Sequence, residues 1–235
     1  KLIINERHEA WGSLARKLAH EIKNPLTPIQ LTIDRLKNKY SNQISKEDQD
    51  NFKDNLKIIN NQIKQIENLV NEFSDFARMP KPIFQDNDLT ILINESIKLL
   101  QELDTEIEIV FLNNLQKIVF NSDKEQLSRV FLNLIKNSIE SIIQRTEENN
   151  DFKKKITIEL DDKSDHIIFT IVDNGVGFGE IKSDIKDILN PYYTTKKNGT
   201  GLGLSIVNKI INDHNGNIEF ISIDDGAKIK IIFSK

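Results

Sequence analysis

Apolar side chains recur every three or four positions through the first part of the chain. Between residues 5 and 40 this spacing places them on one stripe of a helix, at about 100° per residue. The stripe consists of Trp11, Leu14, Leu18, Ile22, Leu26, Ile29, Ile33 and Leu36. The polar run "NKYSNQIS" interrupts the pattern, and "SKEDQDNF" then has the serine and acidic residue that favour a new helix start.

The second predicted helix carries a stricter repeat. Its apolar residues alternate by fours and threes, which is the spacing of a heptad seam. They are Phe52, Leu56, Ile59, Ile63, Ile66, Val70 and Phe73. The run "MPKP" at residues 79–82 ends the pattern, because proline cannot continue a helix. Two helices with one stripe each cannot bury both stripes alone, so we expect an antiparallel helical hairpin that dimerises into a four-helix bundle. Packing against the rest of the same chain is the alternative.

After residue 82 the pattern changes to short β-branched runs that alternate with helical stretches. The predicted strands are "EIEIVFL", "KITIEL", "HIIFTIVD", "NIEFISI" and "KIKIIF". The predicted helices cover residues 89–103, 124–143 and 204–214. We therefore expect an α+β protein with a hairpin domain at residues 1–80 and a mixed domain at residues 81–235, its strands paired largely as hairpins near the C-terminus.

Composition narrows the classes of function. The 235 residues carry a net charge of -4 and no basic stripe, which gives no reason to expect nucleic acid. There is no cysteine, so disulfides, thiolate metal sites and thiol nucleophiles are excluded. No apolar run approaches the roughly 18 to 20 residues that span a bilayer, and we expect no signal peptide. Met79 is the only methionine, so we expect a fragment of a longer protein.

The stretch "LAHEIKNPLTP" places a histidine on the polar side of the first helix. His20 falls roughly opposite the apolar stripe, and Asn24 shares its face. Glu21 can fix the tautomer of the ring through Nδ1-H, which leaves Nε2 as a nucleophile, and Asn24 can position a water. A surface histidine without a function is the alternative. Pro25 and Pro28 each remove a backbone donor at a cost of about 3 kcal/mol, so we expect them to bend and loosen the helix just past His20.

Two motifs in the second domain supply polar groups. In "NLIKNSIES", Asn133 and Asn137 share a helical face and suit a hydrated Mg²⁺, although a solvated surface pair is the alternative. In "IVDNGVGF", Asp173 ends a strand, where it can accept a hydrogen bond from an exocyclic amine. Gly175 and Gly177 would let the backbone approach a flat ring; a plain turn after a strand is the alternative.

A third motif, "NGTGLGLSIV", brings glycines directly before a helix. Gly199, Gly201 and Gly203 predict a phosphate cradle, because they deliver flexible backbone donors to a helix N-terminus. The run differs from the dinucleotide fingerprint G-x-G-x-x-G, since no parallel βαβ unit with an acidic residue follows. It also lacks the Gly-Lys-Ser/Thr of a Walker A motif.

In this order the motifs resemble those of a sensor histidine kinase catalytic core. "HEIKNPLTP" is similar to its H box, "NLIKNS" to its N box, "DNGVGF" to its G1 box, "NPYYTTK" to its F box and "GTGLGL" to its G2 box. The run "AWGSLARKLAHEIKNPLTPIQLTIDRLKNKY" resembles the NtrY type of nitrogen-regulation sensor. The resemblance implies a dimerisation and phosphotransfer hairpin followed by an ATP-binding α/β sandwich of the Bergerat or GHKL type. Tyr192 and Tyr193 stand where the F box usually has phenylalanine, which keeps the aromatic bulk.

The resemblance also implies roles for individual residues. His20 becomes the phosphoacceptor, Glu21 its general base, and Asn24 the group that orients water for dephosphorylation of a partner. Asp173 reads the adenine amine, and Asn137 is the chief Mg²⁺ ligand. The further residues implied to bind ATP are Asn133, Lys136, Gly175, Gly177, Tyr193, Thr195, Lys196, Gly199, Thr200, Gly201, Leu202 and Gly203.

The implied reaction is autophosphorylation by MgATP and transfer to an aspartate of an NtrX-like response regulator, with phosphatase activity toward that regulator. The implied oligomer is a homodimer formed through the hairpin, without nucleic acid, in a cytoplasmic part of a parent protein held in the inner membrane. Two alternatives are a GHKL-type ATPase and a dimeric scaffold that binds ATP without histidine phosphotransfer.

Overall fold

The computed structural model describes the chain except at positions 1, 42, 46, 78, 103, 149–151, 179–187, 192 and 195–198. The side chains of residues 2–14, 16, 147 and 148 are likewise not described, so Trp11 and Leu14 of the predicted stripe lie outside the description. Two compact units are present. One is Lys1–Pro80 with Thr195–Leu202, and the other is Lys81–Thr194 with Gly203–Lys235.

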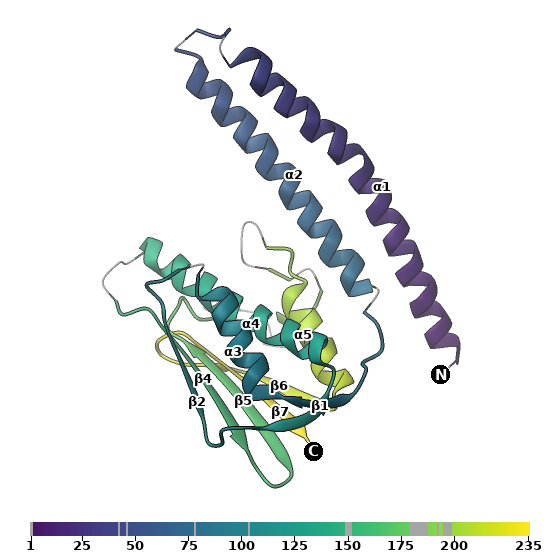
Figure 1. Cartoon of the computed structure of the whole chain (residues 1–235), viewed down its shortest axis with the longest axis vertical. Coiled ribbons are helices and arrows are strands. Elements are labelled where there is room, and N and C mark those ends of the chain that lie inside the picture. Colours follow the sequence, from purple (N-terminus) through teal and green to yellow (C-terminus); the bar gives the residue numbers. More distant parts are fainter. Residues whose placement is uncertain are drawn as a thin grey trace. The chain divides into compact units, whose positions relative to one another are not determined.

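The first unit is built on a pair of long helices, α1 (Leu2–Tyr40) and α2 (Gln49–Ala77), which run antiparallel as a hairpin (Figure 1). Helix α1 continues through both prolines. Pro25 leaves the Glu21 carbonyl without its helical donor, and Pro28 does the same to the Asn24 carbonyl. One turn further on, the Thr32 hydroxyl donates to the Pro28 carbonyl at 2.8 Å.

The apolar stripe of each helix is divided between two faces. The residues at 7% exposure or less are Ala15, Ala19, Leu26, Ile33, Leu56, Ile63 and Val70. The residues that alternate with them remain 38% to 45% exposed: Leu18, Ile22, Ile29, Leu36, Ile59 and Ile66. A helix buries only the side that meets its neighbour, so a single hairpin covers half of each predicted stripe. The other half forms an exposed seam, by which we mean the second group of residues.

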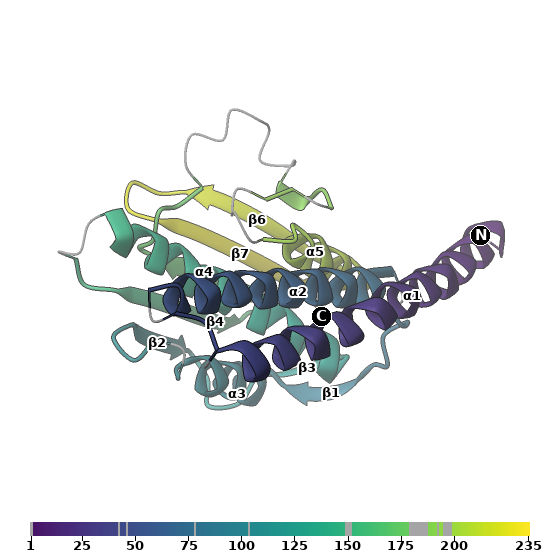
Figure 2. The ribbon, with the colours of Figure 1, turned by 90° about the horizontal axis from the view of Figure 1, so that it is seen from above.

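The second unit is a two-layer α+β sandwich. Its main sheet contains β2 (Glu108–Asn113), β4 (Lys155–Asp162), β5 (His166–Asp173), β6 (Gly216–Ser222) and β7 (Ala227–Ser234), in the order β2-β4-β5-β7-β6. Strands β2 and β4 are parallel, whereas the other pairs are antiparallel. Helices α3 (Leu89–Leu100), α4 (Lys124–Glu148) and α5 (Gly203–Asp213) lie on one face (Figures 1 and 2). The predicted fold class is confirmed.

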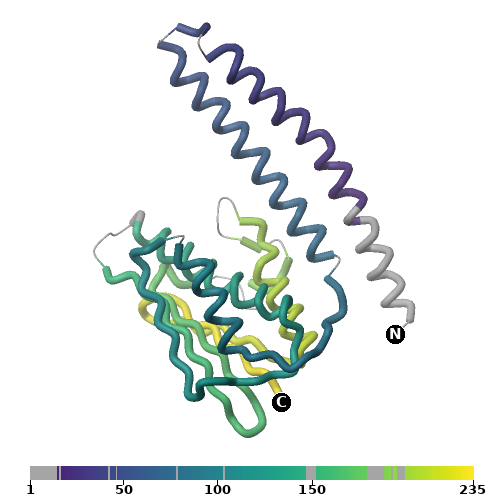
Figure 3. The backbone as a smooth tube through the Cα atoms, in the orientation of Figure 1, coloured from purple at the N-terminus to yellow at the C-terminus, as the bar shows by residue number. Residues whose placement is uncertain are grey.

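The core of this unit lies between the three helices and the sheet. Burial alternates along β7, because only one of its faces is covered. Phe131 on α4 meets Phe169 on β5 with ring centroids 5.0 Å apart, and both side chains are fully buried. The chain path in Figure 3 reaches β7 from β5 only after passing through α5 and β6. Strand β5, which ends at Asp173, lies inside the sheet with β4 on one side and β7 on the other.

A small second sheet was not predicted. It pairs β1 (Gln85–Asp88) with β3 (Val119–Ser122) in antiparallel fashion. The strands are short and largely polar, so they lack the alternation that marks a strand in sequence. The Asn87 side chain donates to the Ser122 carbonyl at 2.7 Å and links the two strands. Asp88 then caps α3 by accepting from the Thr90 N–H at 3.0 Å.

Candidate functional site

Helix α4 presents a row of polar residues along one side. Asn133, Asn137, Ser141 and Arg145 are spaced by four residues, so they follow one another from turn to turn. Asn133 is half-buried, and its amide nitrogen donates to the Arg129 carbonyl at 2.9 Å. Its amide oxygen lies 3.5 Å from the place that a Cβ on Gly203 would take. The start of α5 therefore packs beside the first part of this row.

The row continues to the end of β5, where Asp173 is buried at 5% exposure. The Ser138 hydroxyl donates to its Oδ2 at 2.9 Å, and the Gly175 N–H donates to its Oδ1 at 3.0 Å. Burial raises the pKa of Asp173 above its ordinary value of 3.8, and the hydrogen bonds from Gly175, Ser138 and Ser141 partly offset this effect. A hydrogen-bond donor from a ligand would stabilise the charged carboxylate further.

The loop at residues 174–178 follows Asp173 and packs directly on α4. A Cβ on Gly175 would lie 2.2 Å from the Ser141 hydroxyl oxygen and 2.5 Å from its backbone carbon. The Val176 N–H donates to the Ser141 carbonyl at 3.3 Å. Gly177 has a φ of +69°, and a Cβ there would lie 2.7 Å from the Gly226 carbonyl oxygen. The structure shows that close protein contacts exclude a side chain at both positions, and the expectation that these glycines admit a flat ring stays a prediction.

The predicted nucleotide residues are divided between the two units, and some of them are not described by the structure. Asn133, Asn137, Asp173, Gly175, Gly177 and Gly203 belong to the second unit and lie along α4, at the end of β5 or at the start of α5. Lys136 is exposed on α4, where it pairs with Glu140 at 3.9 Å, and Tyr193 is half-buried. Gly199, Thr200, Gly201 and Leu202 group with the first unit, where the Leu202 N–H donates to the Thr200 hydroxyl at 3.3 Å. Tyr192, Thr195 and Lys196 lie outside the described residues.

The polar side chains of Asn133, Asn137 and Asp173 fit a nucleotide that carries magnesium better than they fit a metal ion held by the protein alone. Among the described residues, no group of three or more His, Cys, Asp or Glu is placed to hold a metal ion. Asn133 and Asn137 offer neutral amide oxygens, which suit an ion that keeps several waters and binds phosphates at the same time. The buried Asp173 carboxylate is the complement of an exocyclic amine.

The histidine motif lies on α1. His20, Glu21 and Asn24 are all exposed, whereas the neighbouring Ala19 is 4% exposed and faces into the hairpin. His20 and Asn24 are one turn apart and share a face, as predicted from the spacing. No helix in the part of the chain that the structure describes is long and apolar enough to cross a bilayer.

Sequence reasoning missed three residues that hold the Asp173 loop. The Ser138 hydroxyl donates to Asp173, Ser141 packs against Gly175 and accepts from the Val176 N–H, and Arg145 donates to the Asn174 carbonyl at 2.7 Å. The four-residue repeat that begins at Asn133 was the available signal for Ser141 and Arg145. The repeat gave no partner for them, because their contacts lie about thirty residues away in the sequence.

Two family models match the chain. Residues 10–82 match the His Kinase A (phospho-acceptor) domain, and residues 122–235 match the histidine kinase-, DNA gyrase B- and HSP90-like ATPase. The chain is 38% identical to a sensor histidine kinase NtrY-like protein of Rickettsia prowazekii (strain Madrid E), over 99% of its own length and 37% of the relative's. It is 35% identical to the nitrogen regulation protein NtrY of Azorhizobium caulinodans, over 96% of its own length and 29% of the relative's.

Solved structures agree with these matches. The histidine kinase ThkA, solved in complex with the response regulator protein TrrA, has a TM-score of 0.65 and 26% identity, covering 98% of this chain and 64% of that one. The ThkA catalytic domain alone covers 65% of this chain and 96% of that one, with a TM-score of 0.57 and 28% identity. With a phospho-acceptor domain followed by an ATPase domain, and NtrY-like relatives along nearly its whole length, this chain belongs to the sensor histidine kinases.

Proposed function

We propose that this chain is the ATP-dependent protein-histidine kinase core of a longer, NtrY-like sensor. Its reaction transfers the γ-phosphoryl group of ATP to Nε2 of His20, then onward to an aspartate of a response regulator. One observation carries this proposal: an exposed His20 on a helical hairpin and a buried Asp173 beside α4 occur together in a chain that matches both the phospho-acceptor and the ATPase families.

We assign nucleotide binding to the motifs on α4, after β5 and before α5. Asp173 accepts a hydrogen bond from the adenine amine, and Gly175 and Gly177 shape the loop beside the ring. Asn137 holds Mg²⁺, with Asn133 next to the phosphates, and Lys196 reaches the γ-phosphate. The remaining contacts come from Lys136, Tyr193, Thr195, Gly199, Thr200, Gly201, Leu202 and Gly203. The bound MgATP supplies the phosphoryl group and the charge neutralisation that its departure needs.

The histidine is prepared by its neighbour. Glu21 accepts the Nδ1 proton of His20, which raises the electron density at Nε2 as the N–P bond forms and the bond to the leaving ADP oxygen breaks. Exposure of His20 on α1 leaves it open to a nucleotide and, later, to a receiver aspartate. Asn24, on the same face, orients a water for dephosphorylation of the regulator.

The partners follow from the surface of the hairpin and from the relatives. The exposed seam repeats on both helices, and a second hairpin would bury it in a homodimeric four-helix bundle. ThkA was solved with the regulator TrrA, and by analogy this chain acts on a regulator, which we propose to be NtrX-like. The parent protein is then a membrane-held nitrogen-regulation sensor with this core on the cytoplasmic side.

Two variants test the proposal. His20→Ala should bind ATP as tightly as the wild type but take no label from γ-labelled ATP. Asp173→Asn should take little label because it binds ATP poorly. Label that persists in His20→Ala would contradict the proposed phosphoacceptor. Hydrolysis of ATP with no label on the wild type would favour a GHKL-type ATPase, and binding without turnover would favour a scaffold.

A separate assay addresses dephosphorylation. A phosphorylated regulator incubated with Asn24→Ala should keep its phosphate for longer than with the wild type, while autophosphorylation of His20 continues. Equal loss of phosphate with both proteins would remove Asn24 from the proposed role.

A further inference from the structure

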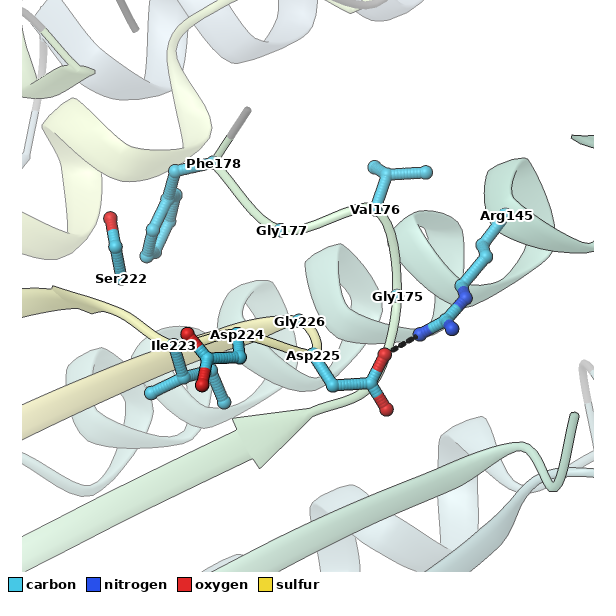
Figure 4. A pocket seen from close by; sticks show the side chains of 10 residues that line it. All are labelled: Arg145, Gly175, Val176, Gly177, Phe178, Ser222, Ile223, Asp224, Asp225 and Gly226. Atoms are coloured by element: carbon cyan, nitrogen blue, oxygen red, sulfur yellow. Dashed lines mark hydrogen bonds and ion pairs between the residues drawn. The ribbon is translucent and has the colours of Figure 1, made fainter. Parts of the chain in front are cut away.

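A pocket of about 370 Å³ lies beside the Asp173 loop, and Gly175 and Gly177, which the proposed function places next to the nucleotide, form part of its lining. It is bounded by the loop at residues 175–178, the turn at residues 222–226 between β6 and β7, and Arg145 near the end of α4 (Figure 4). Figure 4 shows the Arg145 side chain reaching from α4 to Asp225 on that turn. The pocket therefore lies between the loop at residues 175–178 and the β6–β7 turn, and the Arg145 side chain connects the two.

Arg145 makes three contacts. Its Nη1 donates to the Asn174 carbonyl at 2.7 Å and also to the Asp225 carboxylate. Its guanidinium carbon lies over the Phe152 ring, 4.4 Å from the ring centroid, which is within the range of a cation–π contact. The side chain is 25% exposed, so these contacts are partly shielded from water. One residue of α4 thus connects the Asp173 loop and the β6–β7 turn.

The loop and the turn are in close contact where Arg145 joins them. A Cβ on Gly226 would lie 1.8 Å from the Asp173 carbonyl oxygen, and the φ of Gly226 is +110°. On the other side, the Asn174 amide nitrogen donates to the Lys153 carbonyl at 2.6 Å, and its amide oxygen accepts from the Lys155 N–H at 2.9 Å. The backbone on either side of Asp173 is therefore fixed by contacts outside the nucleotide site, and the ion pair of Arg145 with Asp225 is one of these contacts.

We infer that Arg145 is a positioning residue for adenine recognition, which it serves by holding the loop at residues 174–178 against α4 and the β6–β7 turn. This inference rests on the proposed role of Asp173 in reading the adenine amine. Arg145 does not touch the nucleotide in this account. It fixes the direction of the Asp173 carboxylate, and a hydrogen bond to an amine depends steeply on that direction.

The preference for ATP over a nucleotide without the amine tests this inference, because a substitution that only lowers stability would leave the preference unchanged. Inosine triphosphate has an oxo group where ATP has the exocyclic amine, so the ratio of the two dissociation constants reports the Asp173 contact. We would measure both constants for the wild type, Arg145→Met, Arg145→Lys and Asp225→Asn, with thermal melting of each. Lys209→Met is the matched control, because it also removes a cation from a partly shielded ion pair, with Asp213 at 3.1 Å.

Arg145→Met should weaken ATP binding roughly tenfold and leave inosine triphosphate binding nearly unchanged, so that the preference for ATP is largely lost. Arg145→Lys should recover part of the preference through one hydrogen bond. Asp225→Asn, at an exposed position, should lower the preference about twofold to threefold even if Arg145→Met melts early. The control should keep the wild-type ratio.

Equal weakening of both nucleotides in Arg145→Met and an unchanged ratio in Asp225→Asn would overturn the inference, because Arg145 would then act on stability alone. If the wild type itself does not prefer ATP over inosine triphosphate, the proposed role of Asp173 fails and the inference falls with it. The wild-type ratio therefore tells the two failures apart.

Discussion

At the scale of single residues, the most informative group is the buried carboxylate of Asp173. Burial raises its pKa above 3.8, so the charged form is less stable in the folded chain than in the unfolded chain. The cost is present at every pH above the folded pKa, and it disappears as the pH falls below 3.8, where both states are protonated. Asp173, which we propose to bind the adenine amine, is thus kept at the expense of stability.

We predict that Asp173→Asn is more stable than the wild type at pH 7 and that this difference shrinks as the pH is lowered toward 4. The amide still accepts from the Gly175 N–H, and the Ser138 hydroxyl can rotate to accept from the amide nitrogen. The same variant should bind ATP at least about tenfold more weakly. Denaturant unfolding across the pH range measures the first effect. A variant less stable than the wild type at pH 7 would contradict the assigned cost.

Gly175 is closely packed against the protein, whereas Gly203 has only an ordinary van der Waals neighbour. Gly175→Ala should lower the free energy of unfolding by about 1–3 kcal/mol, because the new methyl group would overlap the backbone of Ser141. Adding Ser141→Ala should give little rescue, since it removes the hydroxyl and leaves the backbone carbon at 2.5 Å. Gly203→Ala is the control: its Cβ would lie 3.5 Å from Asn133, so thermal melting should be unchanged or slightly higher. Equal losses in both variants would refute this distinction.

Individual residues were predictable from the sequence where their spacing was local. His20 and Asn24 share an exposed face, as the helical period predicts. The need for glycine at Gly175 and Gly226 was not predictable, because the neighbours that exclude a side chain there belong to α4 and to the end of β5, which are distant in the sequence. Arg145 lacked a visible partner for the same reason: Asp225 is 80 residues away in the sequence.

At the scale of elements, Asp123 joins the start of α4 to the segment before β1. Its carboxylate accepts from the Gln126 N–H at 3.0 Å, which caps α4, and from the Ile83 N–H at 2.8 Å. Its own N–H donates to Nε2 of the buried His214 at 3.0 Å, so Nδ1 carries the proton that is donated to the Ile210 carbonyl at 2.8 Å. The ends of α4, α5 and the Ile83 segment meet at this residue.

Asp123→Ala should therefore cost about 1–3 kcal/mol in the free energy of unfolding, because both acceptors disappear from a buried position. Asp123→Asn keeps one acceptor oxygen and should cost about half as much. Glu125→Ala, on an exposed side chain of the same first turn, is the control and should change stability by less than about 0.5 kcal/mol. Identical melting of Asp123→Ala and the wild type would show that the cap is not needed.

The elements were predictable where the apolar pattern was strong. The strands of the main sheet and all three helices beside it occur where they were predicted, although α3 ends at Leu100 and α4 extends to Glu148. Strands β1 and β3 were missed, because pairing between distant segments, rather than hydrophobic alternation, defines them. The parallel pairing of β2 with β4 was likewise not visible in the sequence.

At the scale of the whole molecule, the exposed seam predicts the oligomeric state. Ile59→Glu places a charge in the proposed dimer interface and should shift the chain toward monomer in light scattering or sedimentation. Ile58→Glu is the matched control, since Ile58 is 58% exposed and lies outside the seam, whereas Ile59 is 44% exposed and lies within it. If both variants remain dimeric, or if the wild type is monomeric, the seam is not the interface.

The central claim is that a histidine on the hairpin accepts phosphate from ATP. The most direct measurement is the chemical stability of the label after incubation with γ-labelled ATP and Mg²⁺, with wild type and His20→Ala side by side. A phosphorus–nitrogen bond predicts label that is lost in acid, survives in alkali and is absent from the variant. Label that survives acid, or that remains on His20→Ala, would contradict the claim.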